Sequence, residues 1–364
     1  MPKELALIVG ARPNFMKAAP LLETIRARGR LAARLIHTGQ HFDDNMSAVF
    51  FQQLGMAEPD VYLDIHGGSA YEQVARVIVE LGRQFEARRP EMVVVFGDVN
   101  STLAGAITAN KMNILLAHVE AGLRSFDRQM PEEHNRIVTD MLSDLLLTPS
   151  ADGDENLKNA GVPAERIFRV GNIMVDSLLR FRPAAEQLAA WTQYSLPPKE
   201  YGLVTLHRPS NVDNKAALRQ IVAALVEIQS EAPLLFPVHP RTYERLSAWG
   251  LLAQLEVSGV KVTGPVGYLE FVSLMSQARF VLTDSGGIQE ESMVMGVPCL
   301  TARENTERPI TIELGGNRLV GNSKAGILAG FAAIRAEKAA PRQPELWDGK
   351  TAERIEAILW EYLR

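Results

Sequence analysis

The chain has 364 residues, of which 46% are hydrophobic, so two domains with separate cores can form. The formal net charge is −5, and its 38 basic residues are spread among 43 acidic ones, which argues against nucleic acid and anionic membranes as partners. An anionic small ligand is not excluded, because a few local cations and helix-terminal amides can hold a phosphate on an acidic protein.

The single cysteine, Cys299, cannot form an internal disulfide, and its apolar surroundings indicate a buried strand. The first apolar run, residues 5–9, is too short for the core of a signal peptide. No later segment reaches the roughly 20 uninterrupted apolar residues of a membrane span. We therefore expect a cytoplasmic protein.

Short strand-like runs alternate with helical patterns along the whole chain, for example at 69–88, 215–230 and 269–276 for helices. Strands are expected at residues 5–9, 34–37, 92–96, 114–119, 145–148, 202–206, 234–238, 260–263, 280–283 and 297–301. This order is typical of parallel sheets with helices on both faces. The predicted fold is α/β, with two Rossmann-like, doubly wound domains that face each other across a cleft.

We expect the chain to divide into two domains, with boundaries after residues 171 and 350. Residues 1–171 form the predicted first domain and residues 172–350 the second, with the stiff segment 195–198 suited to a linker. A final helix, residues 351–364, is expected to pack back on the first domain. Ligands of such sheets bind beyond the carboxyl ends of the strands, so motifs at those ends are the candidates for function.

The first candidate motif, GARPNFMK, runs from Gly10 to Lys17, directly after the first predicted strand. It lacks the glycine spacing of a dinucleotide fingerprint and the ending of a P-loop, which weakens the case for nicotinamide or ATP. Arg12 and Lys17 beside free amides at a helix start suit an oxyanion or a diphosphate. The alternative is a Gly-Pro turn with two solvated charges.

The second motif, TDSGGIQEE, joins a predicted strand to a helix at residues 283–291. Ser285, Gly286 and Gly287 would hold a diphosphate, because glycines allow close backbone approach and the helix start offers amides. The carboxylate of Glu291 could accept both hydroxyls of a ribose. The alternative is that the acidic residues only complement the helix dipole.

Three carboxylates also follow predicted strands or turns: Asp98 in FGDVNST, Glu120 in HVEAGLRS and Glu132 in MPEEHNR. Carboxylates in one partly desolvated site differ in protonation at neutral pH, which is what paired acid and base chemistry requires. The alternatives are helix caps at Asp98 and Glu132, and an ion pair between Glu120 and Arg124.

Two histidines, His207 and His239, are expected at the ends of consecutive strands of the second domain, where each could hydrogen-bond a phosphate or sugar. Arg308, in ENTERP, could clamp a phosphate. The alternatives are structural histidines and a surface turn. The sequence has neither the histidine pairs nor the cysteine clusters of a metal site, and DSGG is not a nucleophile elbow.

Eight motifs together resemble the non-hydrolysing UDP-N-acetylglucosamine 2-epimerases. GARPNFMK, FGDVNST, HVEAGLRS, MPEEHNR, LHR, PVHP, TDSGGIQEE and TERP occur in that family's order between residues 10 and 321. The resemblance implies a glycosyltransferase-B type fold with the nucleotide sugar in the interdomain cleft. It also implies elimination of UDP with loss of the proton at carbon 2, a 2-acetamidoglucal intermediate, and re-addition of UDP to give UDP-N-acetylmannosamine, without cofactor or metal.

Roles carry over by the same resemblance. Asp98, Glu120 and Glu132 correspond to proton-transfer residues, and His207 to a residue that assists phosphate departure. The residues that correspond to the family's UDP-sugar contacts are Arg12, Lys17, Arg136, His239, Ser285, Gly286, Gly287, Glu291 and Arg308. A second, activating UDP-sugar site would draw on Gln40, His41 and Arg208, although residues 64–70 do not match that family segment.

The chain departs from the common family pattern at Ala11, Asn14 and Phe15, and in the PSN that follows Arg208. These changes leave open a related substrate, such as a UDP-linked diacetamido uronic acid. Other readings are a glycosyltransferase of the same fold, a hydrolysing epimerase, and a UDP-sugar sensor. A homodimer and a role in cell-surface polysaccharide synthesis are further expectations from the resemblance.

Overall fold

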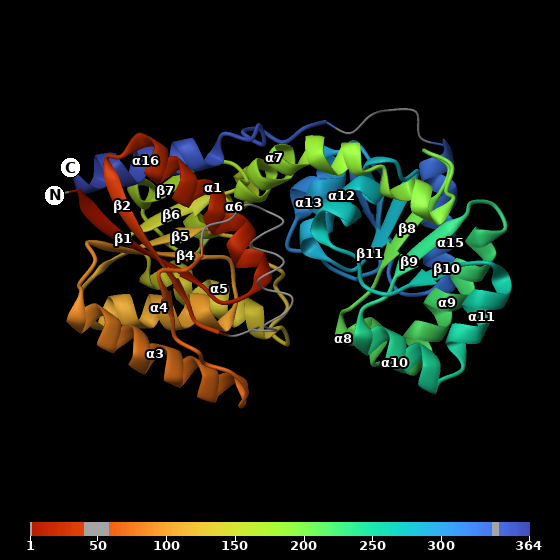
Figure 1. Cartoon of the computed structure of the whole chain (residues 1–364), viewed down its shortest axis with the longest axis horizontal. Coiled ribbons are helices and arrows are strands. Elements are labelled where there is room, and N and C mark those ends of the chain that lie inside the picture. Colours follow the sequence, from red (N-terminus) through yellow and green to blue (C-terminus); the bar gives the residue numbers. More distant parts are fainter. Residues whose placement is uncertain (1, 40–57, 337–341) are drawn as a thin grey trace. The chain divides into compact units, whose positions relative to one another are not determined.

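The computed structural model describes residues 2–39, 58–336 and 342–364 (Figure 1). It divides into two compact units. Unit 1 comprises residues Met1–Ser177 and Glu345–Arg364, and unit 2 comprises Leu178–Pro344. Within the described ranges, every helix is too short or too polar to cross a lipid bilayer.

Unit 1 contains a seven-stranded parallel sheet in the order β3-β2-β1-β4-β5-β6-β7. Its strands are β1 (Lys3–Val9), β2 (Leu31–His37), β3 (Val61–Tyr62), β4 (Met92–Phe96), β5 (Leu115–Val119), β6 (Leu145–Thr148) and β7 (Ile167–Arg169). Its helices are α1 (Arg12–Arg28), α3 (Ala70–Ala87), α4 (Asn100–Lys111), α5 (Pro131–Leu142), α6 (Ala151–Asn159) and α16 (Thr351–Leu363).

Helices cover both faces of the unit 1 sheet, with α3 and α4 on one face and α1 and α16 on the other (Figure 1). Successive residues of a strand point to opposite faces of the sheet, so a sheet covered on both faces needs apolar residues at every position of its central strands. Ile8 and Val95 pack with Leu81 and Phe85 of α3, while Leu7 and Val94 are buried on the opposite face. The central strands are therefore hydrophobic throughout, as the sequence pattern predicts.

Unit 2 contains a six-stranded parallel sheet in the order β10-β9-β8-β11-β12-β13. Its strands are β8 (Gly202–Thr205), β9 (Leu234–Pro237), β10 (Lys261–Thr263), β11 (Phe280–Thr283), β12 (Cys299–Thr301) and β13 (Asn317–Leu319). Its helices are α8 (Pro209–Val212), α9 (Lys215–Gln229), α10 (Pro240–Ala248), α11 (Leu251–Ser258), α12 (Tyr268–Ser276), α13 (Gly286–Val294), α14 (Pro309–Glu313) and α15 (Lys324–Ala336).

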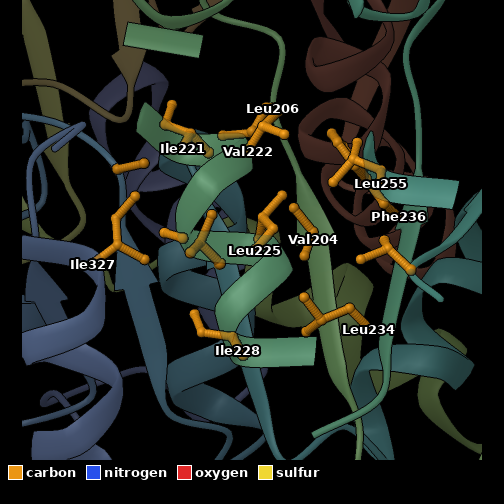
Figure 2. Packing of buried hydrophobic residues seen from close by; sticks show 14 of the residues in the cluster. Val204, Leu206, Ile221, Val222, Leu225, Ile228, Leu234, Phe236, Leu255 and Ile327 are labelled. Atoms are coloured by element: carbon orange, nitrogen blue, oxygen red, sulfur yellow. The ribbon is translucent and has the colours of Figure 1, made fainter. Parts of the chain in front are cut away.

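The main core of unit 2 lies between its sheet and α9, α11 and α15. Figure 2 shows Val204 and Phe236 of the sheet against Leu225 of α9, Leu255 of α11 and Ile327 of α15. A second cluster covers the other face of the sheet with α12. Each sheet is thus enclosed on both sides, which leaves the strand ends as the places where polar side chains gather.

Chain segments cross between the units at two points. Helix α7 (Ile173–Leu188) contains the first, because the unit boundary follows Ser177 rather than the expected Gly171. The second precedes Glu345. The stiff segment 195–198 comes after the short 3-10 helix Ala190–Tyr194 and lies inside unit 2. That each unit is an independently folding domain stays a prediction.

Helix α16 packs on α1, and buried polar contacts hold it there. The fully buried carboxylate of Glu356 pairs with Arg28 at 2.8 Å and accepts a hydrogen bond from Arg30 Nε at 3.2 Å. Asp176 of α7 accepts from the first amides of α16, those of Thr351 and Ala352, at 3.2 and 2.8 Å. These bonds satisfy helix-start donors that have no partner within α16.

Candidate active site

The carboxyl ends of β1, β4 and β5 bring three of the predicted motifs together in unit 1. β4 lies between β1 and β5, and its register with β5 ends at the pair of Phe96 and Val119, so Gly97 and Glu120 are the next residues along the chain. Gly97 adopts φ +61°, a left-handed conformation that lets the chain turn sharply after β4. A Cβ at Gly97 would lie 2.8 Å from Lys17 Nζ, so a larger residue would displace the end of that flexible side chain in addition to adopting a strained backbone.

Lys17 and Glu120 form an ion pair across this site, and their side chains are only 10% and 7% exposed. Glu120 has φ +75°, an uncommon conformation for a non-glycine residue and one that often marks a functional site. The predicted alternative, a pair between Glu120 and Arg124, does not form. Arg124 pairs instead with Asp140 at 2.6 Å.

Asp98 is held by residues of α5. Its Oδ2 lies 2.5 Å from Arg136 Nη2, and its backbone carbonyl accepts from Asn135 at 2.8 Å. Arg136 also contacts Glu133 at 2.6 Å, so one guanidinium bridges two carboxylates. Arg136 and Glu133 are buried, whereas 27% of the Asp98 side chain is accessible.

The two glutamates of MPEEHNR have different environments. Glu132 is exposed on the first turn of α5, whereas Glu133 is buried. Glu133 accepts hydrogen bonds from the amides of Ser125 and Phe126 at 2.9 and 3.0 Å, and so fixes the loop before α5. The proton-transfer role of Glu132 stays a prediction; Glu133 is a structural residue that the sequence reasoning missed.

A buried histidine, His118, holds the turn at Gly97 through a hydrogen bond. His118 Nε2 donates to the carbonyl of Gly97 at 2.8 Å, and its Nδ1 lies 2.7 Å from Asp140 Oδ1. Asp140 also accepts from the Gly122 amide at 3.2 Å. His118 and Asp140 therefore connect the turns that carry Asp98 and Glu120. The sequence reasoning did not assign a role to His118, although a histidine inside the apolar run LLAHV indicates a buried polar contact.

The first motif differs from the expectation in one respect. The amides of Gly10 and Ala11 are not free, because both donate to Asn14 Oδ1, at 3.3 and 3.2 Å. Asn14 also donates to the Phe96 carbonyl at 2.9 Å and thereby ties the start of α1 to β4. Arg12 begins α1. Gln40 and His41 lie outside the described residues, and the structure does not describe the side chain of Arg12.

In unit 2, Asp284 organises the strand ends of β8 and β11. It is fully buried and accepts from the amides of His207 and Arg208, both between 3.0 and 3.2 Å. Its Oδ1 lies 3.0 Å from His207 Nδ1. Burial raises the pKa of Asp284, but the hydrogen bond and charge of His207 outweigh this and leave the pKa below its usual value.

Ser285, Gly286 and Gly287 begin α13 as predicted, with Ser285 at the N-cap position and partly exposed. The Ser285 side chain makes no capping hydrogen bond, and its amide donates to Thr283 Oγ1 at 3.0 Å. Glu291 is buried one turn later, where its Oε1 accepts from Tyr268 at 3.0 Å.

Arginines and glutamates alternate behind this helix start. Arg308 is buried and pairs with Glu290 at 2.5 Å. Glu307 pairs with Arg303 at 2.8 Å and with Arg208 at 3.3 Å. Burial opposes ionisation of Glu307, but Arg308, Arg303 and Arg208 hold its pKa well below the usual range. The predicted clamp Arg308 is thus part of a buried charge network rather than of a surface turn.

Two other predicted residues of unit 2, His239 and Cys299, differ in exposure. His239 is exposed at the N-cap of α10, where its Nδ1 accepts from the Arg241 amide at 3.3 Å. Burial of part of the ring, with the charges of His207 and Arg241, lowers the pKa of His239. Cys299 is a buried free thiol in β12, as predicted, and burial raises its pKa to about 11.

Comparison with known proteins decides the family. The model of the UDP-N-acetylglucosamine 2-epimerase family matches residues 23–360. The chain belongs to this family. It is therefore related to isomerases, and seven of the eight motifs identified above lie within the matched range.

Relatives match over nearly the whole chain. A UDP-N-acetylglucosamine 2-epimerase of Methanocaldococcus jannaschii is 40% identical over 362 residues, covering 98% of each chain. A UDP-2,3-diacetamido-2,3-dideoxy-D-glucuronate 2-epimerase of Pseudomonas aeruginosa is 44% identical over 325 residues, covering 88% of this chain and 89% of the relative.

Solved structures agree. The Methanocaldococcus jannaschii UDP-GlcNAc 2-epimerase in complex with UDP-GlcNAc and UDP has a TM-score of 0.90 at 40% identity, covering 98% of this chain and 99% of that one. The Neisseria meningitidis UDP-GlcNAc 2-epimerase bound to UDP-GlcNAc has a TM-score of 0.89 at 27% identity, covering 98% and 100%. The two parallel-sheet units thus have the glycosyltransferase-B type fold that the motifs predict.

Proposed function

We propose that this chain inverts carbon 2 of UDP-N-acetylglucosamine by eliminating and re-adding UDP. One observation carries the proposal: in a member of the epimerase family, Asp98 and the buried Lys17–Glu120 pair lie at the carboxyl ends of adjacent strands. A proton at carbon 2 has no neighbouring carbonyl to acidify it. It can leave only as the bond from carbon 1 to the diphosphate breaks.

The residue types fit both halves of that step. Carboxylates can take up the proton and stabilise positive charge on the ring, while cations and amides stabilise the departing diphosphate. Asp98 and Glu120 are our candidates for proton transfer, with Glu132 as a third. Ser285, Gly286 and Gly287, with His207, are our candidates for binding the diphosphate. The first set belongs to unit 1 and the second to unit 2.

The test is proton NMR of the purified protein with UDP-N-acetylglucosamine in deuterated water. We expect the resonances of UDP-N-acetylmannosamine to appear, with deuterium at carbon 2 of both sugars. Asp98→Asn should abolish turnover while UDP still binds in calorimetry. Release of free N-acetylmannosamine would indicate a hydrolysing enzyme instead. Binding without label exchange would indicate a sensor, and transfer of the sugar to an added acceptor would indicate a glycosyltransferase.

A second substrate is supported by the 44% identity to the diacetamido-glucuronate epimerase of Pseudomonas aeruginosa. That sugar carries a carboxylate and a second acetamido group, so its binding site needs additional polar partners that UDP-N-acetylglucosamine does not require. The two substrates are separated by measuring kcat/KM for each with the same enzyme preparation. A higher kcat/KM for the diacetamido uronate would assign the chain to that reaction.

Three further proposals come from the family resemblance: a homodimer in solution, a cytoplasmic location, and supply of a precursor for cell-surface polysaccharide. Light scattering of the purified protein tests the first. An activating second site with Arg208 is a separate proposal. Its test is a sigmoidal dependence of the rate on substrate that Arg208→Ala makes hyperbolic.

A further inference from the structure

His207 is the histidine of unit 2 expected to face a departing diphosphate, and its ring is held from one side by Asp284. The two residues come from neighbouring parallel strands, since Thr205 at the end of β8 pairs in register with Thr283 at the end of β11. The next residues of β11 and β8 therefore meet at the same edge. Asp284 is fully buried there, while 46% of the His207 side chain is exposed.

The surroundings of Asp284 determine its charge. Its two carboxylate oxygens accept from the His207 amide at 3.1 and 3.2 Å, from the Arg208 amide at 3.0 Å and from Asn211 Nδ2 at 3.1 Å. The other hydrogen of that Asn211 amide donates to the Ala302 carbonyl at 2.8 Å, which defines the orientation of the amide. The partners of Asp284 are all donors that favour the ionised form, and with His207 they keep the pKa of Asp284 below its usual value despite its burial. Asp284 is therefore a carboxylate.

The charge of Asp284 in turn determines where His207 carries its hydrogen. A carboxylate only accepts, so the ring nitrogen 3.0 Å from it, Nδ1, must be the donor. Nε2 is then the ring nitrogen that does not face Asp284, on a side chain that is 46% exposed. A second proton on Nε2 would give a cation whose charge Asp284 offsets, which is the form suited to stabilising a diphosphate leaving group.

We propose that Asp284 is the positioning residue of His207: it selects the Nδ1–H form of the ring and directs Nε2 toward the diphosphate of the bound UDP-sugar. The inference rests on the proposed function for the identity of the ligand. The geometry of the Asp284–His207 pair belongs to the protein alone. Asp284 does not touch substrate; it acts through His207.

The first experiment measures the ring directly and needs no activity. In protein labelled with ¹⁵N-histidine, a long-range ¹H–¹⁵N spectrum distinguishes the two neutral forms of each imidazole, and His207→Gln assigns the signal. We expect wild-type His207 in the neutral form to carry its hydrogen on Nδ1. A hydrogen on Nε2 in the wild-type protein would overturn the proposal by itself, whatever any variant does.

The second experiment uses Asp284→Asn, with Asp213→Asn as its matched control. Asp213 follows α8 in the same unit and pairs with Arg241 and Arg245 rather than with His207. We expect Asp284→Asn to lose the Nδ1–H preference and to reduce kcat on the order of 10²–10⁴-fold, the scale of removing an acid–base group or its orienting carboxylate. UDP affinity should change far less, and Asp213→Asn should behave as wild type.

A third variant separates positioning from general structural damage. If Asp284 acts through His207, adding Asp284→Asn to His207→Gln should cost little further activity, because residues that act as a unit are not additive. Full additivity of the two losses would contradict the proposal. If the wild-type enzyme failed to epimerise any UDP-sugar, the proposed function would fail while the Nδ1–H result for His207 would stand.

Discussion

The ammonium group of Lys17 and the carboxylate of Glu120 form an ion pair between α1 and the end of β5, with 10% and 7% of the two side chains exposed. Removing one partner of a buried pair leaves an uncompensated charge, which costs more than removing both. Comparing single and double variants therefore separates the contribution of the pair to stability from its contribution to catalysis.

We expect Lys17→Met and Glu120→Gln each to destabilise unit 1 by about 3 kcal/mol, because each leaves the other charge of the pair buried without it. The double variant Lys17→Met/Glu120→Gln should recover part of the stability of Lys17→Met but none of its activity. Urea unfolding and the deuterium-exchange assay measure the two quantities. Recovery of turnover in the double variant would show that the pair is only structural.

Ser285 is predicted to bind the diphosphate through its hydroxyl, which makes no helix-capping bond in the protein. We expect Ser285→Ala to weaken UDP affinity about tenfold, the loss of roughly one charge-assisted hydrogen bond, with little change in stability. Calorimetry with UDP measures the affinity. Ser230→Ala, at the far end of α9, is the matched control, and equal affinities in the two variants would exclude the assigned contact.

His118 links the Gly97 carbonyl to Asp140 inside unit 1, at 2.8 and 2.7 Å. We expect His118→Phe to destabilise the protein by about 2 kcal/mol, because the buried Gly97 carbonyl loses this donor while Asp140 keeps Arg124 and the Gly122 amide as partners. Urea unfolding measures this loss. His134→Phe, on the exposed face of α5, should change stability by less than about 0.5 kcal/mol. Similar losses in both variants would contradict a supporting role for His118.

His37, at the end of β2, should make stability depend on pH. Its ring is 2% exposed, stacks on Phe15 with centroids 4.9 Å apart, and has a pKa lowered to about 4 by burial and then by His66. The unfolded chain binds a proton near pH 6.5, whereas the folded ring resists protonation until about pH 4. The stabilisation is therefore complete above pH 6.5 and is lost as the pH falls toward 4.

The expected loss across that window is about 3 kcal/mol, since each pKa unit corresponds to about 1.4 kcal/mol. We expect His37→Phe to flatten the fall in melting temperature between pH 6.5 and 4, while His134→Gln leaves it unchanged. Calorimetric scans at a series of pH values make the comparison. A wild-type slope retained in His37→Phe would place the responsible group elsewhere.

Much of the architecture was predictable from the order of residues. The predicted strands at 92–96, 145–148 and 280–283 match β4, β6 and β11 in both bounds, because central parallel strands are continuous apolar runs. The sequence reasoning omitted β3, β7 and β13. Each is an edge strand of two or three residues, with partly exposed side chains and no continuous apolar run.

The sequence by itself determined the family, the alternation of strands and helices, and the residue types at the strand ends. Only the tertiary structure decided partners: Lys17 rather than Arg124 for Glu120, Glu133 rather than Glu132 as the buried glutamate, and Asp284 beneath His207. Hydrophobic periodicity is local and can be read along the chain. Which charges pair depends on strand order and on the turns at Gly97 and Glu120, which bring together residues far apart in sequence.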